Sequence, residues 1–278
     1  MKTKIFSVLA GIAMIAACGQ TPEERVAAYE TAHDILMGEY REMMDSLSGD
    51  KEKQEAFYNE FVERYIEFNL KAAKKNPQND VAIEVLKNLR GLIEDEQVAA
   101  IIDRMSPEML ENKTVKSLKA GLDARLATAE GKPFVDFTVN SVVGQTRSIP
   151  PQQIYGEVKL SDYVGKGKYI LLDFWSPWCG PCRREMPNIK AVYDKYHGEN
   201  FDVVSIAVWE REPVEVTIET AAKLNMTWNQ ITNGGSEPAA LYGVDGIPHI
   251  ILFGPDGTIL KRGFHGAEIA EVVSSYLD

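Results

Sequence analysis

The sequence has few residues that could bind a metal through sulfur or imidazole. Only three cysteines and four histidines occur in 278 residues. Cys179 and Cys182 are separated by two residues, and Cys18 lies near the N-terminus. A closed structural zinc site needs four ligands, and the histidines supply no second pair at zinc-finger spacing. We therefore predict no metal, no cofactor, and no structural disulfide outside the Cys179/Cys182 pair.

An excess of positive charge is also lacking. The formal net charge is −11. Residues 22–130 carry 15 Lys and Arg against 23 Asp and Glu, and residues 131–278 carry 13 against 18. Two acidic halves argue against a nucleic-acid-binding surface. The length and the apolar content of 45% predict two globular domains with a large core.

The apolar run at residues 5–15 is too short to span a bilayer as a helix. It follows Lys2 and Lys4 and precedes Ile15-Ala16-Ala17-Cys18, an arrangement typical of a secretory signal. This end resembles a bacterial lipobox, in which the cysteine is acylated and becomes the mature N-terminus. The resemblance implies a signal peptide over residues 1–18, a lipid anchor on Cys18, and a place in the cell envelope facing the periplasm. The membrane that holds the anchor stays open, and so does an ordinary signal peptide that ends near a cysteine.

Residues 19–130 have the apolar periodicity of helices. The first helix is expected to start at Thr21, which can act as its N-cap. Pro22 suits the first helical position, and Glu24 completes a capping box with Thr21. Breaks at residues 48–50 and 76–79 predict about five antiparallel helices joined by short loops. An aromatic stripe recurs at helical spacing and is either core or a groove for a partner peptide: Phe57, Phe61, Tyr65 and Phe68. The role of this all-helical domain is not predicted.

Residues 131–278 alternate strands with helices, which predicts an α/β domain. A strand at residues 134–143 and a loop or irregular hairpin at 144–156 come first. The remaining expected elements are strands at 169–175, 201–208, 227–232, 249–253 and 258–263, and helices at 183–197, 213–224, 237–242 and 267–277.

The Cys179/Cys182 pair lies where a buried strand is followed by a helix. Unpaired backbone N–H groups and the helix dipole favour an anion at that helix N-terminus. Thiolate is the form of cysteine that attacks a disulfide, so Cys179 is the expected nucleophile. Cys182, one turn into the helix, can then resolve the mixed disulfide. Half of a zinc site and a purely structural disulfide are the alternatives.

Residues 131–278 resemble the thioredoxin superfamily, and within it the TlpA/ResA group of membrane-attached, extracytoplasmic thiol–disulfide oxidoreductases. The resemblance rests on residues 174–187, on Gly246-Ile247-Pro248, and on the turn at residues 254–257. It implies a thioredoxin fold, with a central mixed sheet flanked by helices, that exchanges a dithiol for a disulfide with protein substrates. Peroxiredoxins share the fold but need a peroxidatic cysteine in a different motif.

The resemblance also assigns two carboxylates to the site. Asp173 matches the buried acid of thioredoxin, and Glu185 matches that of the ResA-like group. Burial raises the pKa of a carboxyl group, so such a group could exchange a proton with Cys182 near neutral pH. We expect Asp173 to be the relay and Glu185 a helper. The alternative for Glu185 is a partly exposed helix residue paired with Arg183 or Arg184.

Substrate-binding residues follow from the same resemblance. Pro248 matches the family's cis-proline, which exposes the backbone of Ile247 for pairing with a substrate peptide. Trp178 is expected to be exposed and to contact partners, whereas Trp175 is expected in the core. His249 could bind a substrate or serve only as a strand residue.

Gly180-Pro181 is the pair found between the cysteines of thioredoxins, which act as reductants. The resemblance therefore implies disulfide reduction, with electrons supplied by a membrane partner that the sequence does not identify. A net oxidase or isomerase is the alternative within this chemistry. A binding protein whose helical half holds a ligand under control of a redox switch is the alternative outside it.

Overall fold

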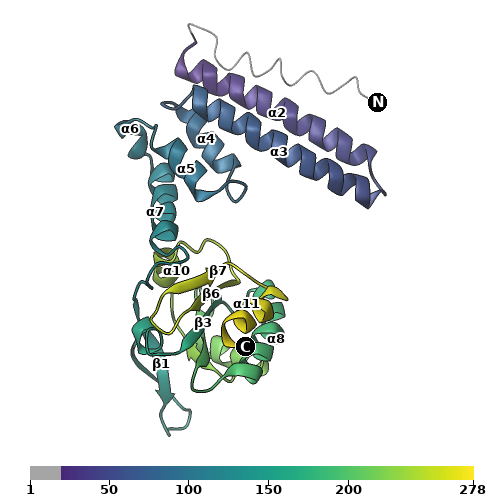
Figure 1. Ribbon diagram of the computed structural model, residues 1–278. Helices are drawn as coiled ribbons and strands as arrows, with labels where there is room; N and C mark the ends of the chain where they lie inside the picture. The colour runs from purple at the N-terminus through teal and green to yellow at the C-terminus, as the bar shows by residue number, and fades with distance from the viewer. Residues whose placement is uncertain (1–19) are drawn as a thin grey trace. The chain divides into compact units, whose positions relative to one another are not determined.

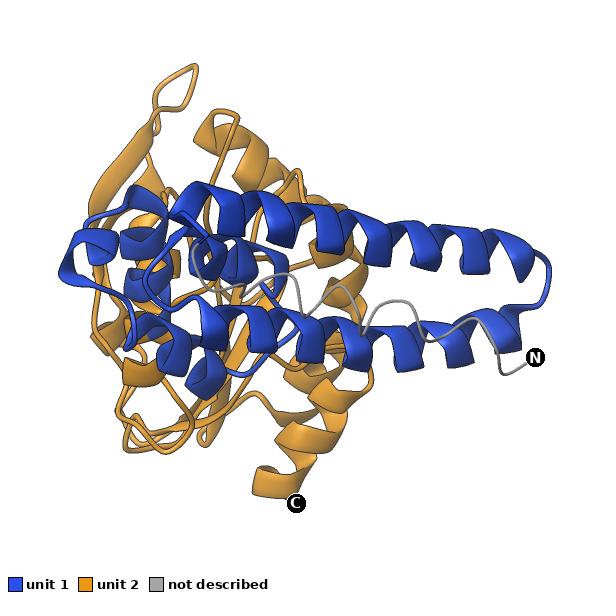
Figure 2. Cartoon of the chain, turned by 90° about the horizontal axis from the view of Figure 1, so that it is seen from above, with its two compact units in different colours: residues 1–122 blue, residues 123–278 orange. Residues whose placement is uncertain are grey.

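The computed structural model describes residues 20–278, so the expected signal peptide and the lipidation site Cys18 lie outside the described residues. The chain divides into two compact units between Leu122 and Asp123, coloured separately in Figure 2. The sequence places the boundary after residue 130, close to this division. Within residues 20–278, no helix combines the length and the apolarity needed to cross a membrane.

The first unit is helical, as predicted. Its two long helices, α2 and α3, lie side by side (Figure 1). The expected capping box of α2 is present, because Thr21 and Glu24 bond to each other's backbone N–H groups. The chain after Ser106 forms two helices and not one, because Asn112 accepts the N–H of Thr114 and starts a new helix. The elements are α2 (Pro22–Ser46), α3 (Lys51–Lys75), α4 (Asp80–Asn88), α5 (Asp95–Ile102), α6 (Pro107–Leu110) and α7 (Lys113–Ala127), which runs past the division.

The aromatic stripe of α3 forms the core of this unit. Phe61, Tyr65 and Phe68 are buried against α2, and Phe57 packs partly buried beside them. The stripe is therefore not an open groove.

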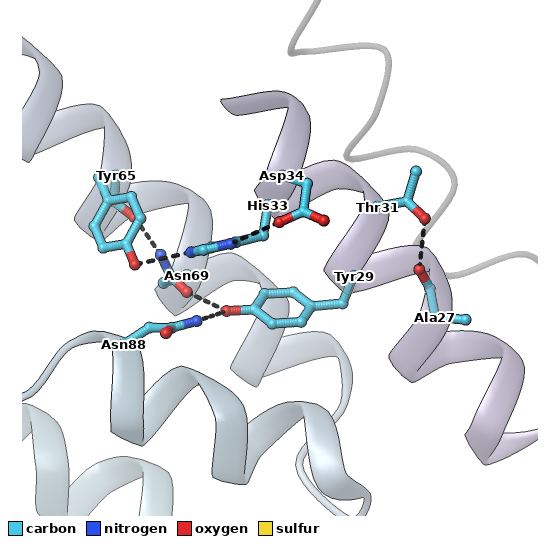
Figure 3. A network of polar contacts seen from close by, with 8 residues as sticks. All are labelled: Ala27, Tyr29, Thr31, His33, Asp34, Tyr65, Asn69 and Asn88. Atoms are coloured by element: carbon cyan, nitrogen blue, oxygen red, sulfur yellow. Dashed lines mark hydrogen bonds and ion pairs between the residues drawn. The ribbon is translucent and has the colours of Figure 1, made fainter. Parts of the chain in front are cut away.

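A buried polar network joins α2, α3 and α4 (Figure 3). The Tyr29 hydroxyl donates to Asn69 Oδ1 at 2.5 Å and accepts from Asn88 Nδ2 at 2.8 Å. His33 Nε2 lies 3.0 Å from the Tyr65 hydroxyl, so this histidine has a partner inside the unit. Because unpaired buried polar groups are costly, these bonds fix how the three helices pack.

Removing the Tyr29 hydroxyl is expected to destabilise the helical unit. A Tyr29→Phe variant leaves Asn69 Oδ1 and Asn88 Nδ2 without this partner, which costs about 1–3 kcal/mol of unfolding free energy. Tyr58→Phe removes the same hydroxyl from an exposed ring and should change stability by less than about 0.5 kcal/mol. Urea unfolding followed by circular dichroism measures both, and equal losses would contradict the assignment.

The second unit contains a five-stranded sheet in the order β5-β4-β3-β6-β7. β3 pairs parallel with β4 and antiparallel with β6, so the sheet is mixed, as predicted. The strands are β3 (Tyr169–Trp175), β4 (Phe201–Ala207), β5 (Asn229–Ile231), β6 (His249–Phe253) and β7 (Ile259–Arg262), and the helices are α8 (Gly180–Tyr196), α9 (Val214–Lys223), α10 (Glu237–Leu241) and α11 (Glu268–Leu277).

The two faces of the sheet pack in different clusters. Leu171 and Trp175 of β3 pack with residues of α8 and α11, whereas Leu172 and Phe174 pack in a second cluster with β1 and α10. Since alternate strand residues share a face, Asp173 lies on the face of β3 that α8 covers. The strand alternation therefore brings this carboxyl group under the helix that carries the cysteines.

A separate hairpin precedes the sheet. β1 (Thr138–Gln145) pairs antiparallel with β2 (Gln153–Lys159), with an irregularity between Val142 and Gly144. The sequence predicts a strand at 134–143 and leaves 144–156 as a loop or irregular hairpin, so β2 is only partly anticipated. The outer half of the hairpin is exposed on both faces, and it therefore lacks the apolar alternation that reveals a strand.

Candidate functional site

The Cys179/Cys182 pair lies at the junction of β3 and α8. β3 ends at Trp175, and Cys179 is the N-cap of α8. The two cysteines are joined by a disulfide, with their Cα atoms 5.3 Å apart. The N–H of Cys182 donates to Cys179 Sγ at 3.1 Å. A backbone donor aimed at Sγ is the geometry that stabilises a thiolate once the disulfide is reduced.

The two sulfurs differ in access. Cys179 is 3% exposed and Cys182 is 0% exposed. Only Cys179 offers surface to a partner, which suits it as the attacking thiol. Its Sγ lies 3.6 Å from the carbonyl oxygen of Ile247, and the Ile247–Pro248 peptide bond is cis. The structure thus places Ile247, the residue predicted to pair with substrate backbone, next to the reactive sulfur, and gives Pro248 the expected cis bond.

Asp173 is completely buried in β3. Its Oδ2 accepts the Ser205 hydroxyl at 2.9 Å, and Ser205 Oγ accepts Trp228 Nε1 at 2.8 Å. The other oxygen, Oδ1, is buried with no hydrogen-bond partner among the described residues. Burial raises the pKa of Asp173 to about 7; the Ser205 hydrogen bond opposes this rise, and the charge of Glu185 adds to it. This carboxyl group can therefore change protonation near neutral pH.

Glu185 is 9% exposed and lies in the same helix as Cys182. Its Oε1 accepts Asn188 Nδ2 at 2.7 Å and the N–H of Gly266 at 2.9 Å. The alternative of a partly exposed Glu185 paired with Arg183 or Arg184 is therefore wrong, because the side chain is buried and bonds to Asn188 and Gly266. The carboxylate instead ties α8 to the segment that precedes α11.

Ser205 and Trp228 are site residues that the sequence reading misses. Ser205 is the directly paired neighbour of Asp173 across β3 and β4. The sequence did offer one indication of Ser205: it is a serine within the largely apolar strand at residues 201–207. It is the fifth residue of that strand, as Asp173 is of the strand at residues 169–175. Trp228 gave no such signal, because its indole reaches Ser205 only through the tertiary fold.

Trp178 marks the edge of the site, with 37% of its surface exposed. Its Nε1 donates to the carbonyl of Trp209 at 2.9 Å, and the Arg211 guanidinium carbon lies 3.8 Å from the centre of the ring. Trp175 is completely buried, as expected.

His249 turns toward Arg262, whose Nη2 lies 3.3 Å from His249 Nε2. Burial and the Arg262 charge lower the pKa of His249 to about 4. Its ring is therefore neutral at physiological pH and engaged within the fold, which favours the strand role over substrate binding.

Within residues 20–278, no group of three or more His, Cys, Asp or Glu side chains is arranged to hold a metal ion. The two sulfurs lie at the start of α8, and the buried carboxyl group of Asp173 lies on the face of β3 that this helix covers.

The second unit is similar to known proteins. Residues 131–262 match the AhpC/TSA family. The thiol-disulfide oxidoreductase ResA of Bacillus thuringiensis subsp. konkukian is 25% identical over 148 residues, which cover 53% of this chain and 76% of that protein. ResA of Geobacillus thermodenitrificans is 27% identical over 154 residues, covering 55% and 79%. A crystal structure of the thioredoxin domain of a thiol-disulfide oxidoreductase from Bacteroides vulgatus is similar over 54% of this chain and 99% of that one, at 25% identity and a TM-score of 0.45.

Proposed function

We propose that this chain, whose residues 131–262 match the AhpC/TSA family, is a thiol–disulfide oxidoreductase that reduces disulfides in extracytoplasmic protein substrates. The observation that carries the proposal is the Cys179/Cys182 disulfide at the start of α8, above a buried carboxyl group that titrates near pH 7.

Two exchange steps account for the reaction. In the reduced protein, the Cys179 thiolate attacks one sulfur of a substrate disulfide; the substrate S–S bond breaks, and its other sulfur leaves as a thiolate. Cys182 then gives its proton to Asp173 and attacks Cys179 Sγ. The bond between Cys179 and the substrate breaks, and the second substrate sulfur leaves. The dithiol has supplied two electrons and ends as the Cys179–Cys182 disulfide.

The surroundings of the sulfurs support the reducing direction. Above pH 7, Asp173 carries a negative charge in a fully buried position, on the face of β3 that α8 and its two cysteines cover. A nearby anion disfavours a second anion, so it weakens thiolate stabilisation at Cys182. A less stable reduced form gives electrons away more readily.

The redox potential and turnover test this direction. We expect a midpoint potential near that of thioredoxin, about −270 mV, rather than near the about −120 mV of the oxidant DsbA. We also expect catalytic reduction of insulin that is lost in Cys179→Ser. A potential near the DsbA value would favour the oxidase, and slow stoichiometric reduction without turnover would favour the redox switch.

We further propose that the protein is anchored through a lipid on Cys18 and receives electrons from a membrane protein. The apolar run, the small residues before Cys18 and the extracytoplasmic resemblance support this placement. Mass spectrometry of the mature protein tests the anchor, because an unmodified Cys18 rules it out. Mixed disulfides captured in cells by Cys182→Ser identify substrates and donor.

A further inference from the structure

Arginines are concentrated around the redox disulfide of an acidic unit. Residues 131–278 contain five arginines: Arg147, Arg183, Arg184, Arg211 and Arg262. Arg262 is turned inward and bonds to the carbonyls of Thr128 and Tyr242. Three of the other four lie on the segments that form the redox site. Residues 131–278 are acidic overall, so a group of arginines beside the disulfide does not follow from composition alone and needs a reason specific to this site.

Two of these arginines are in the first turns of α8. Arg183 follows Cys179 by four residues, so the two lie on one side of the helix. The N–H of Arg183 also donates to the carbonyl of Cys179 at 3.1 Å. Arg184 Nη1 lies 3.6 Å from the position that a Cβ on Gly180 would occupy. Both side chains are exposed, next to the turn that holds the disulfide.

Cations are unfavourable at this end of a helix. The N-terminus carries the positive end of the helix dipole, which favours acidic residues, yet the first turn of α8 has none. Later in the same helix, Lys190 pairs with Asp194 and Lys195 pairs with Asp278. In residues 20–278, no carboxylate lies within ion-pair distance of Arg183 or Arg184. The helix thus keeps two unneutralised cations where they cost stability, which points to a use outside the fold.

The third arginine is positioned by the exposed tryptophan. Arg211 stacks on the Trp178 ring, and the Trp178 indole is itself tied to the carbonyl of Trp209. The neighbouring Glu210 is turned away from Arg211: its carboxylate accepts the N–H groups of Gly234 and Gly235, and among the described residues it forms no ion pair with Arg211. A stacked guanidinium keeps its edge N–H groups available for a carboxylate.

We propose that Arg183, Arg184 and Arg211 form a carboxylate-recognition surface around the disulfide, and that the protein selects substrate segments with Asp or Glu next to their disulfide. This inference rests on the proposed function and adds its substrate class. All three cations are arginines, and a planar guanidinium binds a carboxylate through two parallel hydrogen bonds, which lysine does not.

Two matched peptides test the selection. Each carries the same internal disulfide, flanked by Glu residues in one peptide and by Gln in the other, and thiol release by the reduced protein is timed for both. We expect the Glu peptide to react roughly tenfold faster at low salt, since three exposed charge pairs each contribute modestly. The preference should shrink toward onefold at about 0.5 M salt, where screening shortens the range of the charges.

Substitutions of the arginines test whether these side chains cause the preference for the Glu peptide. The triple variant Arg183→Gln/Arg184→Gln/Arg211→Gln should react equally with both peptides, and Arg211→Lys should lose part of the preference although it keeps the charge. Arg147→Gln removes an exposed arginine from the β1–β2 connection and should leave the preference intact. Should the triple variant not fold, the three single variants and the salt dependence of the unchanged protein decide.

Equal rates for the two peptides in the unchanged protein would overturn the inference while leaving the oxidoreductase function standing. A preference that survives in the triple variant would also overturn it. Reduction of neither peptide, together with failure to reduce insulin, would overturn the proposed function itself and this inference with it.

Discussion

The Asp173→Asn variant is expected to be more stable than the unchanged protein at pH 8, by about 4 kcal/mol of unfolding free energy. The cause is the burial of a carboxylate whose pKa is raised from 3.8 to about 7. A shift of about three pKa units corresponds to this free energy at about 1.4 kcal/mol per unit. An amide of similar shape carries no charge to desolvate, and it can keep the hydrogen bond from Ser205.

The pH dependence has a definite sign. Between about pH 4 and pH 7, the folded protein holds a proton on Asp173 that the unfolded chain has released. The stability of the unchanged protein therefore falls as pH rises through this window and levels off above pH 7. The Asn variant lacks this fall, so the gap between the two proteins is small at pH 4 and full at pH 8.

Urea unfolding of the oxidised proteins measures this gap. All four tryptophans lie after residue 170, so their fluorescence reports on the second unit alone. Asp194→Asn, at an exposed position on α8, should change stability by less than about 0.5 kcal/mol at either pH. Parallel pH profiles for the unchanged protein and Asp173→Asn would show that Asp173 is not a buried, titrating group.

The same substitution is expected to slow resolution of the mixed disulfide by about 100-fold at pH 7, the lower end of the range for a positioned general base. In the unchanged protein, the Asp173 carboxylate takes the Cys182 proton, so the rate should rise as pH rises through about 7. In Asp173→Asn that inflection should be absent, and the difference should shrink above about pH 8.5, where a cysteine ionises unaided.

Rapid-quench trapping of the mixed disulfide measures the rate of this step, with Cys182→Ser as the reference in which it cannot occur.

Two further variants should move the pH of this inflection in opposite directions. Ser205→Ala removes a hydrogen bond that lowers the pKa of Asp173, so the inflection should shift to higher pH. Glu185→Gln removes a charge that raises this pKa, so the inflection should shift to lower pH. An inflection that persists unchanged in Asp173→Asn would exclude Asp173 as the relay.

Much of this site could be predicted because it is local in the chain. A strand, a short turn and a helix within residues 169–197 suffice to place Cys179 at a helix N-terminus and Cys182 one turn later. Strand alternation then assigns Asp173 to one face of the sheet. Hydrophobic periodicity likewise located the aromatic stripe of α3, and the structure decided that the stripe is core and not a groove.

By itself, the sequence determined the two kinds of unit and the reactive dithiol, because each is encoded by residues within a few turns of one another; the buried acid was predicted through the resemblance to thioredoxin. Only the tertiary structure decided the partners of these groups. Ser205 reaches Asp173 across the β3–β4 pairing, and Trp228 donates to Ser205. Gly266 binds Glu185 from 81 residues away, and Arg211 stacks on Trp178 from the loop after β4. Such contacts depend on how segments distant in the chain pack, and no local periodicity records that packing.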